Sequence, residues 1–315
     1  MLKIQHGALS KPHLGRSRRL STCRLSVSAE VGFRDAGRPD TLAAMPELPE
    51  VETTRRGIEP HVRGRTIVAL ELYERRLRWP VARSLAARLP GQRIVGTDRR
   101  AKYLLIGLER GTLIVHLGMS GSLRVLPCGA PRLRHDQYDL RLDSGKVLRF
   151  NDPRRFGSLH FTDADPRRHR LLRNLAPEPL DTGFDAEYLW GISRGRRLAI
   201  KQLLMNSRLV VGVGNIYANE ALFRARIRPG RAARRLSRAE ATRLVRAVRT
   251  VLAQAIRAGG TTLRDYVGAD GSPGYFRHKL FVYARAGAPC RVCATPIRRR
   301  TQLGRSTYFC PACQR

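Results

Sequence analysis

Acidic residues are scarce in this 315-residue sequence: 25 Asp and Glu stand against 60 Lys and Arg, which leaves a formal net charge of +35. Such an excess attracts polyanions and raises the rate at which they are encountered. The composition therefore favours a nucleic-acid partner. Charge alone does not separate specific recognition from the unspecific adhesion of a ribosomal protein.

Long apolar segments are missing as well. No apolar run approaches the ~18 residues that a membrane span needs, which argues against a membrane protein. Residues 1–44 also lack the apolar core of about 7–15 residues that is typical of a secretory signal. They are rich in Arg and Ser like an organelle transit peptide, but Glu30, Asp35 and Asp40 weigh against that interpretation. We expect residues 1–44 to be a disordered extension, either a misassigned start or a cleaved segment.

Lysine is rare, with six among the 60 basic residues, a bias that is typical of a GC-rich genome. Because arginine is the ordinary cation of this chain, Lys102 and Lys201 are candidates for specific roles. Cysteine is rare outside the last 26 residues, which hold four of the six. The isolated Cys23 and Cys128 are expected to be free thiols in a reducing compartment.

The four C-terminal cysteines form two C-x-x-C pairs that are separated by 16 residues. This spacing predicts one structural Zn²⁺ ion and disfavours disulfides or a redox pair. Four thiolates complete a tetrahedron and leave no open position, so the metal would hold the intervening hairpin and take no part in catalysis. The predicted ligands are Cys290, Cys293, Cys310 and Cys313.

The order of patterns along the chain predicts an α+β protein. A helix is expected over 51–63, kinked or ended early by Pro60. Short β-rich runs then predict an N-terminal β-sandwich with a hairpin turn at 143–145. Its expected strands include 66–70, 103–106, 112–117, 138–142, 147–150 and 158–161.

Helices are expected to dominate the C-terminal half. Pro177, Pro179 and Gly183 mark a linker. Helices are predicted over 198–204, 216–226 and 238–257, the last capped by Ser237 with Glu240 three residues later. We therefore expect an extension 1–44, a sandwich domain 46–176, a linker 177–195, a helical domain 196–275 and a zinc-finger hairpin 276–315.

The octet that begins at Met45, MPELPEVE, carries the sharpest chemical signal. If translation starts at Met45 and the methionine is removed, Pro46 has a free amine with a pKa of about 8, so a useful fraction is nucleophilic at neutral pH. Glu47 and Glu50 are ordinary first-turn helix acids on one interpretation. On the other, a carboxylic acid beside the reacting carbon supplies general acid catalysis.

Two glycine-bearing turns are candidates for DNA contacts. Residues 211–215 precede a helix and form either an anion site or a joint that needs glycine for packing. Residues 152–157 place Arg154 and Phe156 in a turn that is either solvated or a probe of the base stack. Met119 lies between glycines in an expected loop, which is an unusual place for core packing.

These motifs and their order closely resemble those of the bacterial formamidopyrimidine-DNA glycosylases, over residues 45–315. The matching segments are 45–52, 100–104, 116–121, 152–157, 211–220, 271–276 and the four cysteines. The resemblance implies an N-terminal β-sandwich and a C-terminal helix–two-turn–helix domain that ends in a zinc finger. It also implies excision of oxidised purines, such as 8-oxoguanine and formamidopyrimidines, from duplex DNA, followed by β,δ-elimination.

Residue roles follow from the same resemblance. Pro46 would attack C1′ of the damaged nucleotide and form a Schiff base, Glu47 would protonate the opening sugar, and Glu50 would support the site. Lys102 and Arg305 would act at the phosphates. The other implied DNA-binding residues are Met119, Arg154 and Phe156, which fill the gap left by the extruded base, and His135, Arg196, Lys201 and Asn215. The loop 271–276 would close over the flipped base.

Two departures and two rival functions remain. Asn206 stands where the family more often has an acid, and Arg196 where lysine can occur. With residues 1–44 attached, Pro46 has no free amine, and the chain would be a non-catalytic, zinc-containing DNA-binding protein. A pyrimidine-excising enzyme that resembles endonuclease VIII is the nearer rival. The resemblance favours a monomeric, cytoplasmic bacterial enzyme associated with the nucleoid.

Overall fold

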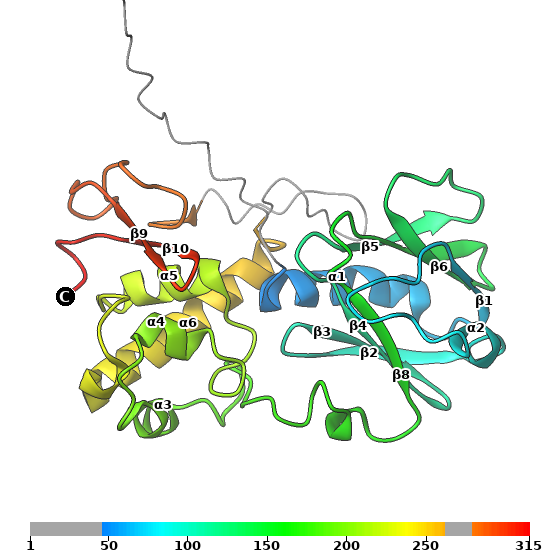
Figure 1. Cartoon of the computed structure of the whole chain (residues 1–315), viewed down its shortest axis with the longest axis horizontal. Coiled ribbons are helices and arrows are strands. Elements are labelled where there is room, and N and C mark those ends of the chain that lie inside the picture. The colour runs from blue at the N-terminus through cyan, green and yellow to red at the C-terminus, as the bar shows by residue number, and fades with distance from the viewer. Residues whose placement is uncertain (1–45, 262–278) are drawn as a thin grey trace, which may run out of the picture. The chain divides into compact units, whose positions relative to one another are not determined.

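Two four-stranded antiparallel sheets build the N-terminal part of the computed structural model, which describes residues 46–261 and 279–315. One sheet has the strand order β1-β6-β7-β5 and the other β2-β3-β4-β8 (Figure 1). The strands are β1 Ile67–Leu72, β2 Ile94–Arg100, β3 Tyr103–Leu108, β4 Gly111–His116, β5 Ser122–Pro127, β6 Asp136–Leu142, β7 Lys146–Asn151 and β8 Ser158–Thr162. A short helix, α2 (Leu85–Arg88), follows β1.

The expected β-sandwich is confirmed, and its hairpin turn at 143–145 joins β6 to β7. Strands β2 and β5 lie in the expected β-rich region but were not among the individual strands predicted. Their burial is mixed along the strand, and β2 ends in Asp98-Arg99-Arg100, so neither carries a clear alternation of apolar and polar residues.

Helix α1 (Leu48–Val62) connects the two hydrophobic cores. Val51, Ile58 and Val62 belong to the core of the sandwich, whereas Leu48 belongs to the core of the helical part. Pro60 was expected to kink helix α1 or to end it early. The helix does not end there, because α1 continues to Val62. A proline in the last turn removes a single backbone donor, and Arg63 N–H still donates to Glu59 O at 3.1 Å.

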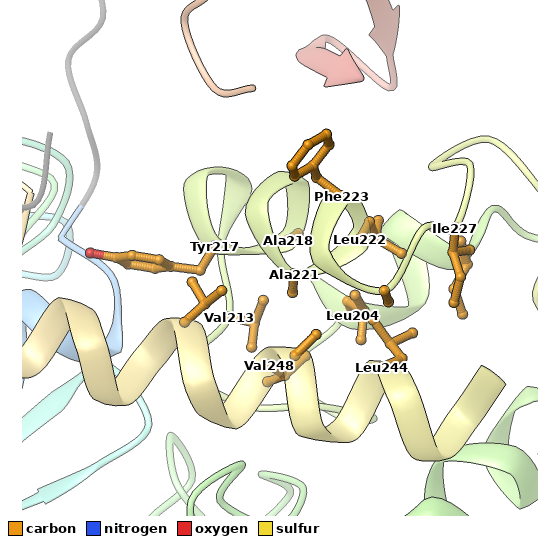
Figure 2. Packing of buried hydrophobic residues seen from close by; sticks show 14 of the residues in the cluster. Leu204, Val213, Tyr217, Ala218, Ala221, Leu222, Phe223, Ile227, Leu244 and Val248 are labelled. Carbon is orange, nitrogen blue, oxygen red and sulfur yellow. The ribbon is translucent and has the colours of Figure 1, made fainter. Parts of the chain in front are cut away.

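Among the described residues, the second part of the chain contains four helices: α3 (Ala186–Ser193), α4 (Ile200–Leu204), α5 (Asn215–Arg224) and α6 (Arg238–Arg257). The 3₁₀ turns η1 (Pro166–Arg168) and η2 (Ala233–Arg235) precede α3 and α6. The capping box of Ser237 and Glu240 is present, so the predicted bounds of α6 are confirmed. Figure 2 shows α5 packed along α6 through apolar side chains such as Ala221, Leu244 and Val248.

The C-terminal hairpin, β9 (Arg298–Gln302) and β10 (Arg305–Phe309), packs on α5. Tyr308 N–H donates to Asn219 Oδ1 at 2.9 Å, and both residues are buried. Gln314 Nε2 donates to Ile227 O at 2.9 Å. The first bond fixes the hairpin to the middle of α5, and the second fixes the segment after the hairpin to the loop that follows α5.

Three predictions remain, on the linker, on the segments 1–44 and 271–276, and on membrane spans. The stretch 177–195, expected as a linker, contains α3, which contacts α6. The extension 1–44 and the loop 271–276 lie outside the described residues. Within the part of the chain that the structure describes, none of the helices has both the length and the apolar character of a membrane span.

Candidate active site

The carboxyl group of Glu47 lies at the N-terminus of α5. Gly214 N–H donates to its Oε2 at 2.7 Å, and Ile216 N–H donates to its Oε1 at 2.9 Å. Leu48 N–H donates in turn to Gly212 O at 3.1 Å. The start of α1 and the start of α5 therefore hold each other, and the predicted pair Pro46 and Glu47 is buried between them.

The Glu47 carboxyl is 2% exposed. Burial raises its pKa to about 7, Lys102 acts to lower it, and Glu50 acts to raise it. The backbone donors at the start of α5 oppose the increase. At neutral pH, a large fraction of Glu47 therefore carries a proton that it can donate.

The amine of Lys102 lies close to this carboxyl. A Cβ atom added at Gly214 would come within 2.7 Å of Lys102 Nζ and closer still to Glu47 Cδ, so both side chains reach the same glycine. Burial lowers the pKa of Lys102, the nearby Glu47 carboxylate raises it, and Arg305 lowers it. The structure thus brings together three predicted site residues: Lys102 from the β2–β3 turn, Glu47 from the start of α1 and Arg305 from the start of β10.

Glu50 holds the backbone that carries Glu47. Its Oε2 accepts from Glu47 N–H at 2.9 Å, and its Oε1 accepts from Tyr217 Oη–H at 2.5 Å and from Thr261 N–H at 2.8 Å. Burial raises the pKa of Glu50, and the Tyr217 hydroxyl acts to lower it. Glu50 therefore joins three separate segments.

The turn that carries Lys102 is fixed from the other side by Glu178. Ala101, in the left-handed region at φ 54°, donates its N–H to Glu178 Oε1 at 2.6 Å. Arg99 and Arg100 each form an ion pair of 2.8 Å with the same carboxylate. Because Ala101 directly precedes Lys102, these bonds fix the direction in which the lysine leaves the turn.

Met119, Arg154 and Phe156 lie on two loops that are joined by the buried Asp152. Ser120 Oγ donates to Asp152 Oδ1 at 3.0 Å, and Gly157 N–H donates to Asp152 Oδ2 at 2.7 Å. Phe156 is 43% exposed, with the Arg154 guanidinium 5.2 Å from its ring centre. An exposed aromatic ring with a guanidinium beside it suits insertion into a base stack.

Lys201 and Asn215 both bind strand β10 of the C-terminal hairpin. Lys201 is 2% exposed and donates to Ser306 O at 3.0 Å and to Thr307 Oγ1 at 2.7 Å. Asn215 Nδ2 donates to the same Ser306 O at 3.1 Å. Burial, followed by the charge of Arg305, lowers the pKa of Lys201 to about 7. The two residues therefore hold the hairpin at the start of α5, which sequence reasoning did not foresee.

Two other predicted DNA contacts, His135 and Arg196, are exposed. His135 has φ 73° and accepts with its backbone oxygen from Asp152 N–H. Arg196 Nε donates to Ile192 O at 2.7 Å. Asn206 is exposed too, and its Oδ1 accepts from Arg208 N–H at 3.0 Å, so it caps a local turn as an aspartate would.

The four predicted metal ligands converge. Their sulfur atoms all lie within 4.8 Å of one another, with Cys293 Sγ at 3.5 Å from Cys310 Sγ and 3.4 Å from Cys313 Sγ. A tetrahedral Zn²⁺ with bonds of about 2.3 Å separates its sulfur ligands by about 3.8 Å. Backbone N–H groups of Val292 and Cys313 point at two of the sulfurs at 3.4 Å. The donor set fits one structural zinc ion.

Sequence reasoning missed Tyr217, Glu178 and Glu220. Glu220 accepts from the backbone N–H groups of residues 281–283, each at 2.9 Å, and so fixes the segment that leads into the zinc finger. Tyr217 and Glu220 fall in the quoted motif 211–220, one helical turn apart, which was the available signal. Glu178 had no signal, since its partners lie 77 to 79 positions away.

Comparison with protein families gives three matches in order along the chain. Residues 45–159 match the formamidopyrimidine-DNA glycosylase N-terminal domain, and residues 175–267 match the H2TH domain of the same family. Residues 287–315 match a zinc finger that is found in FPG and IleRS. The three matches include the strands, α5 and the four cysteines described above.

Individual relatives agree. The formamidopyrimidine-DNA glycosylase of Thioalkalivibrio sulfidiphilus is 59% identical over 271 residues, which are 86% of this chain and 100% of that protein. The crystal structure of the MutM (Fpg) protein from Thermus thermophilus is similar with a TM-score of 0.76 and 43% identity, over 85% of this chain and 98% of that chain. The wild-type Lactococcus lactis Fpg in complex with DNA that contains N7-benzyl-Fapy-dG has a TM-score of 0.80 and 33% identity, over 86% and 100%.

Proposed function

Since this chain belongs to the formamidopyrimidine-DNA glycosylase family, we propose that it excises oxidised purines from duplex DNA with Pro46 as the nucleophile. The family consists of DNA glycosylases that also cleave the strand at abasic sites, and they act in base-excision repair. The observation that carries the proposal is the convergence of Glu47 and Lys102 at Gly214, next to Pro46.

The chemistry assigns one role to each group. The Pro46 nitrogen forms a bond to C1′ of the damaged nucleotide, and the electrons of the glycosidic bond leave with the base, which takes up a proton. The C1′–O4′ bond then breaks, O4′ takes a proton from Glu47, and the proline nitrogen becomes an iminium. The raised pKa of Glu47 supports this role, because the group is still partly protonated at pH 7.

Strand cleavage follows from the iminium. Loss of a C2′ proton expels the 3′ phosphate, and a second elimination expels the 5′ phosphate. Lys102 and Arg305 would stabilise these leaving groups, since Lys102 lies near Glu47 and the positive charge of Arg305 acts on Lys102. Glu50 would keep the Pro46–Glu47 backbone in place through the bond that it accepts from Glu47 N–H.

DNA binding is assigned to the predicted contact residues, all of them exposed or partly exposed except the buried Lys201. Phe156 and Arg154 would enter the stack with Met119 when the damaged base is extruded, which offsets part of the cost of unstacking. The net charge of +35 supplies affinity that does not depend on sequence and weakens with salt. The remaining proposed contacts are His135, Arg196, Lys201 and Asn215.

The mechanism requires a free amine, so we propose that the active form begins at Pro46. The family match begins at residue 45, and the full length of the Thioalkalivibrio sulfidiphilus relative corresponds to 271 residues of this chain. The proposed domains of that form are 46–176, 196–275 and 276–315, with the linker 177–195 between the first two and residues 1–45 absent. The enzyme would act in the bacterial cytoplasm at the nucleoid.

The decisive experiment is borohydride trapping on duplex DNA that contains 8-oxoguanine opposite cytosine. Protein that begins at Pro46 is expected to give a covalent adduct, and the 315-residue chain is expected to bind the same duplex without one. Pro46→Gly should keep binding and lose most turnover. Absence of an adduct from protein whose N-terminus is shown to be Pro46 would refute the proposal.

The same assay separates the rival enzyme class. If the purine assignment is right, an oxidised pyrimidine should be excised from duplex DNA more slowly than 8-oxoguanine. The opposite preference would assign the chain to the class that resembles endonuclease VIII. Intact mass of the protein from its own host would show which N-terminus is used.

A further inference from the structure

A hollow of about 480 Å³ lies where the C-terminal turn of α5, the side of α6 and the zinc finger meet. Phe223, Phe281, Ala247 and Val292 supply its apolar lining. Arg224, Arg226, Arg243 and Arg246 line it as well, and none of the described lining residues is acidic. The size is that of a ligand pocket, and the combination of an apolar floor with cations is typical of a recognition site.

The hollow is separate from the proposed active site. Gly214 and Asn215 stand at the N-terminal end of α5, whereas Phe223 and Arg224 stand at its C-terminal end. At a rise of 1.5 Å per residue, these ends are about 14 Å apart. A molecule in the hollow would therefore leave Glu47 and the proposed phosphate contacts free.

The positive charge of the hollow is not neutralised inside the described part of the protein. Arg226 and Arg246 are exposed, and among residues 46–261 and 279–315 neither forms an ion pair. Arg243 lies 3.9 Å from Glu240, but that carboxylate already makes two shorter bonds to Arg231. The cations are thus available for an acidic partner.

Arg226 occupies a position that ordinarily favours glycine. It follows the last turn of α5 at φ 58°, and Ile227 N–H closes the turn on Leu222 O at 3.0 Å. Glycine reaches this left-handed region without strain, whereas arginine does not. An arginine here places a cation at the mouth of the hollow at some cost to the backbone.

Each of the two aromatic rings of the floor covers one face of the other. The rings of Phe223 and Phe281 stack on each other with centres 5.4 Å apart, and Phe223 is 6% exposed. The guanidinium groups of Arg224 and Arg291 lie 5.3 Å and 5.9 Å from the Phe281 ring centre. Figure 2 shows the Phe223 ring directed away from α6, unlike its neighbours in the core. Single-stranded nucleic acid binds by stacking on open ring faces, so this floor suits an aliphatic or aromatic side chain that contacts ring edges.

We propose that this hollow binds an acidic peptide segment of another protein. Carboxylates of the segment pair with Arg226, Arg243 and Arg246, and one large apolar side chain lies against Phe223, Phe281 and the 61% exposed Val292. Such a contact would bring a partner protein to the enzyme while DNA is bound at the other end of α5.

The test is a fluorescence-anisotropy titration at 150 mM salt with a labelled hexapeptide of four aspartates followed by leucine and phenylalanine. The protein is the chain that begins at Pro46, loaded with zinc. We expect saturable binding that weakens at least tenfold in the double variant Arg243→Glu, Arg246→Glu. A peptide that ends in two alanines should also bind at least tenfold more weakly, because a purely electrostatic contact would not distinguish the two peptides.

Arg235→Glu is the matched control, since Arg235 is an exposed arginine on η2 that does not line the hollow. This single charge reversal should change the affinity for the peptide by no more than twofold. Zinc content, melting temperature and 8-oxoguanine excision of the double variant should equal those of the parent protein. Equal weakening by Arg235→Glu, indifference to the apolar residues, or tighter binding of oligothymidine that competes for the hollow would each overturn the proposal.

Discussion

Replacement of Gly214 by alanine tests whether the site depends on the contact between α1 and α5. Gly214 has φ −117° and ψ −155°, an extended conformation that alanine adopts without strain. The added Cβ would lie 2.7 Å from Lys102 Nζ and nearer still to Glu47. Ordinary contacts between heavy atoms are about 3.5–4.0 Å, so the two side chains must retreat by about 1 Å.

A displacement of about 1 Å at reacting groups costs on the order of 10²-fold in rate. We therefore expect Gly214→Ala to slow single-turnover excision of 8-oxoguanine by about 100-fold, while affinity for an abasic-analogue duplex changes little. The control is Gly191→Ala, where the new Cβ would meet no atom within 4 Å. Excision by Gly214→Ala within threefold of the parent rate would refute the proposed arrangement of Glu47 and Lys102.

Four further outcomes are expected. Glu178→Gln should lower the unfolding free energy by about 3 kcal/mol in urea titrations, because it breaks buried ion pairs, whereas removal of the exposed Arg76 charge should cost far less. Burial raises the pKa of Glu47 from 4.5 to about 7, so the folded state binds this proton more tightly than the unfolded chain does. The free energy of unfolding should therefore fall by up to about 3 kcal/mol between pH 4.5 and 7. Glu47→Gln should lose this pH dependence, and an unchanged profile in the variant would contradict the assignment. Phe156→Ala should lower the single-turnover rate of excision from duplex DNA far more than the rate from DNA in which the damaged base is unpaired. Removal of zinc by a chelator should lower both the melting temperature and DNA affinity, and readdition should restore them.

Local patterns in the sequence were sufficient for much of the fold. The ends of α6 follow from a capping box and from the glycines after it, and both lie within a few residues of the ends that they determine. The cysteine spacing predicts a tetrahedron because two short turns and one hairpin fix all four ligands. In each case, the physical cause is close along the chain.

The rest depends on contacts between distant residues. Lys201 was expected at a phosphate, but its partners in the structure, Ser306 and Thr307, lie 105 and 106 positions further on. Strand β2 is held by neighbours and by Glu59 on α1 more than by its own pattern. The Glu178 clamp and the Tyr217 bond to Glu50 likewise arise only when separate segments meet, so no periodicity or motif spacing could reveal their function.

The location of the proposed nucleophile is set by the helical part of the chain more than by the sandwich that precedes it in sequence. Leu48 is fully buried in the helical core, and Gly212 lies so close to it that a Cβ there would be 2.5 Å from Leu48 Cδ1. Glu47 accepts its shortest bonds from Gly214 and Ile216, not from any sandwich residue. Lys102, by contrast, leaves a sandwich hairpin. The two sides of the site therefore come from different cores, and they face each other only because α1 belongs to both.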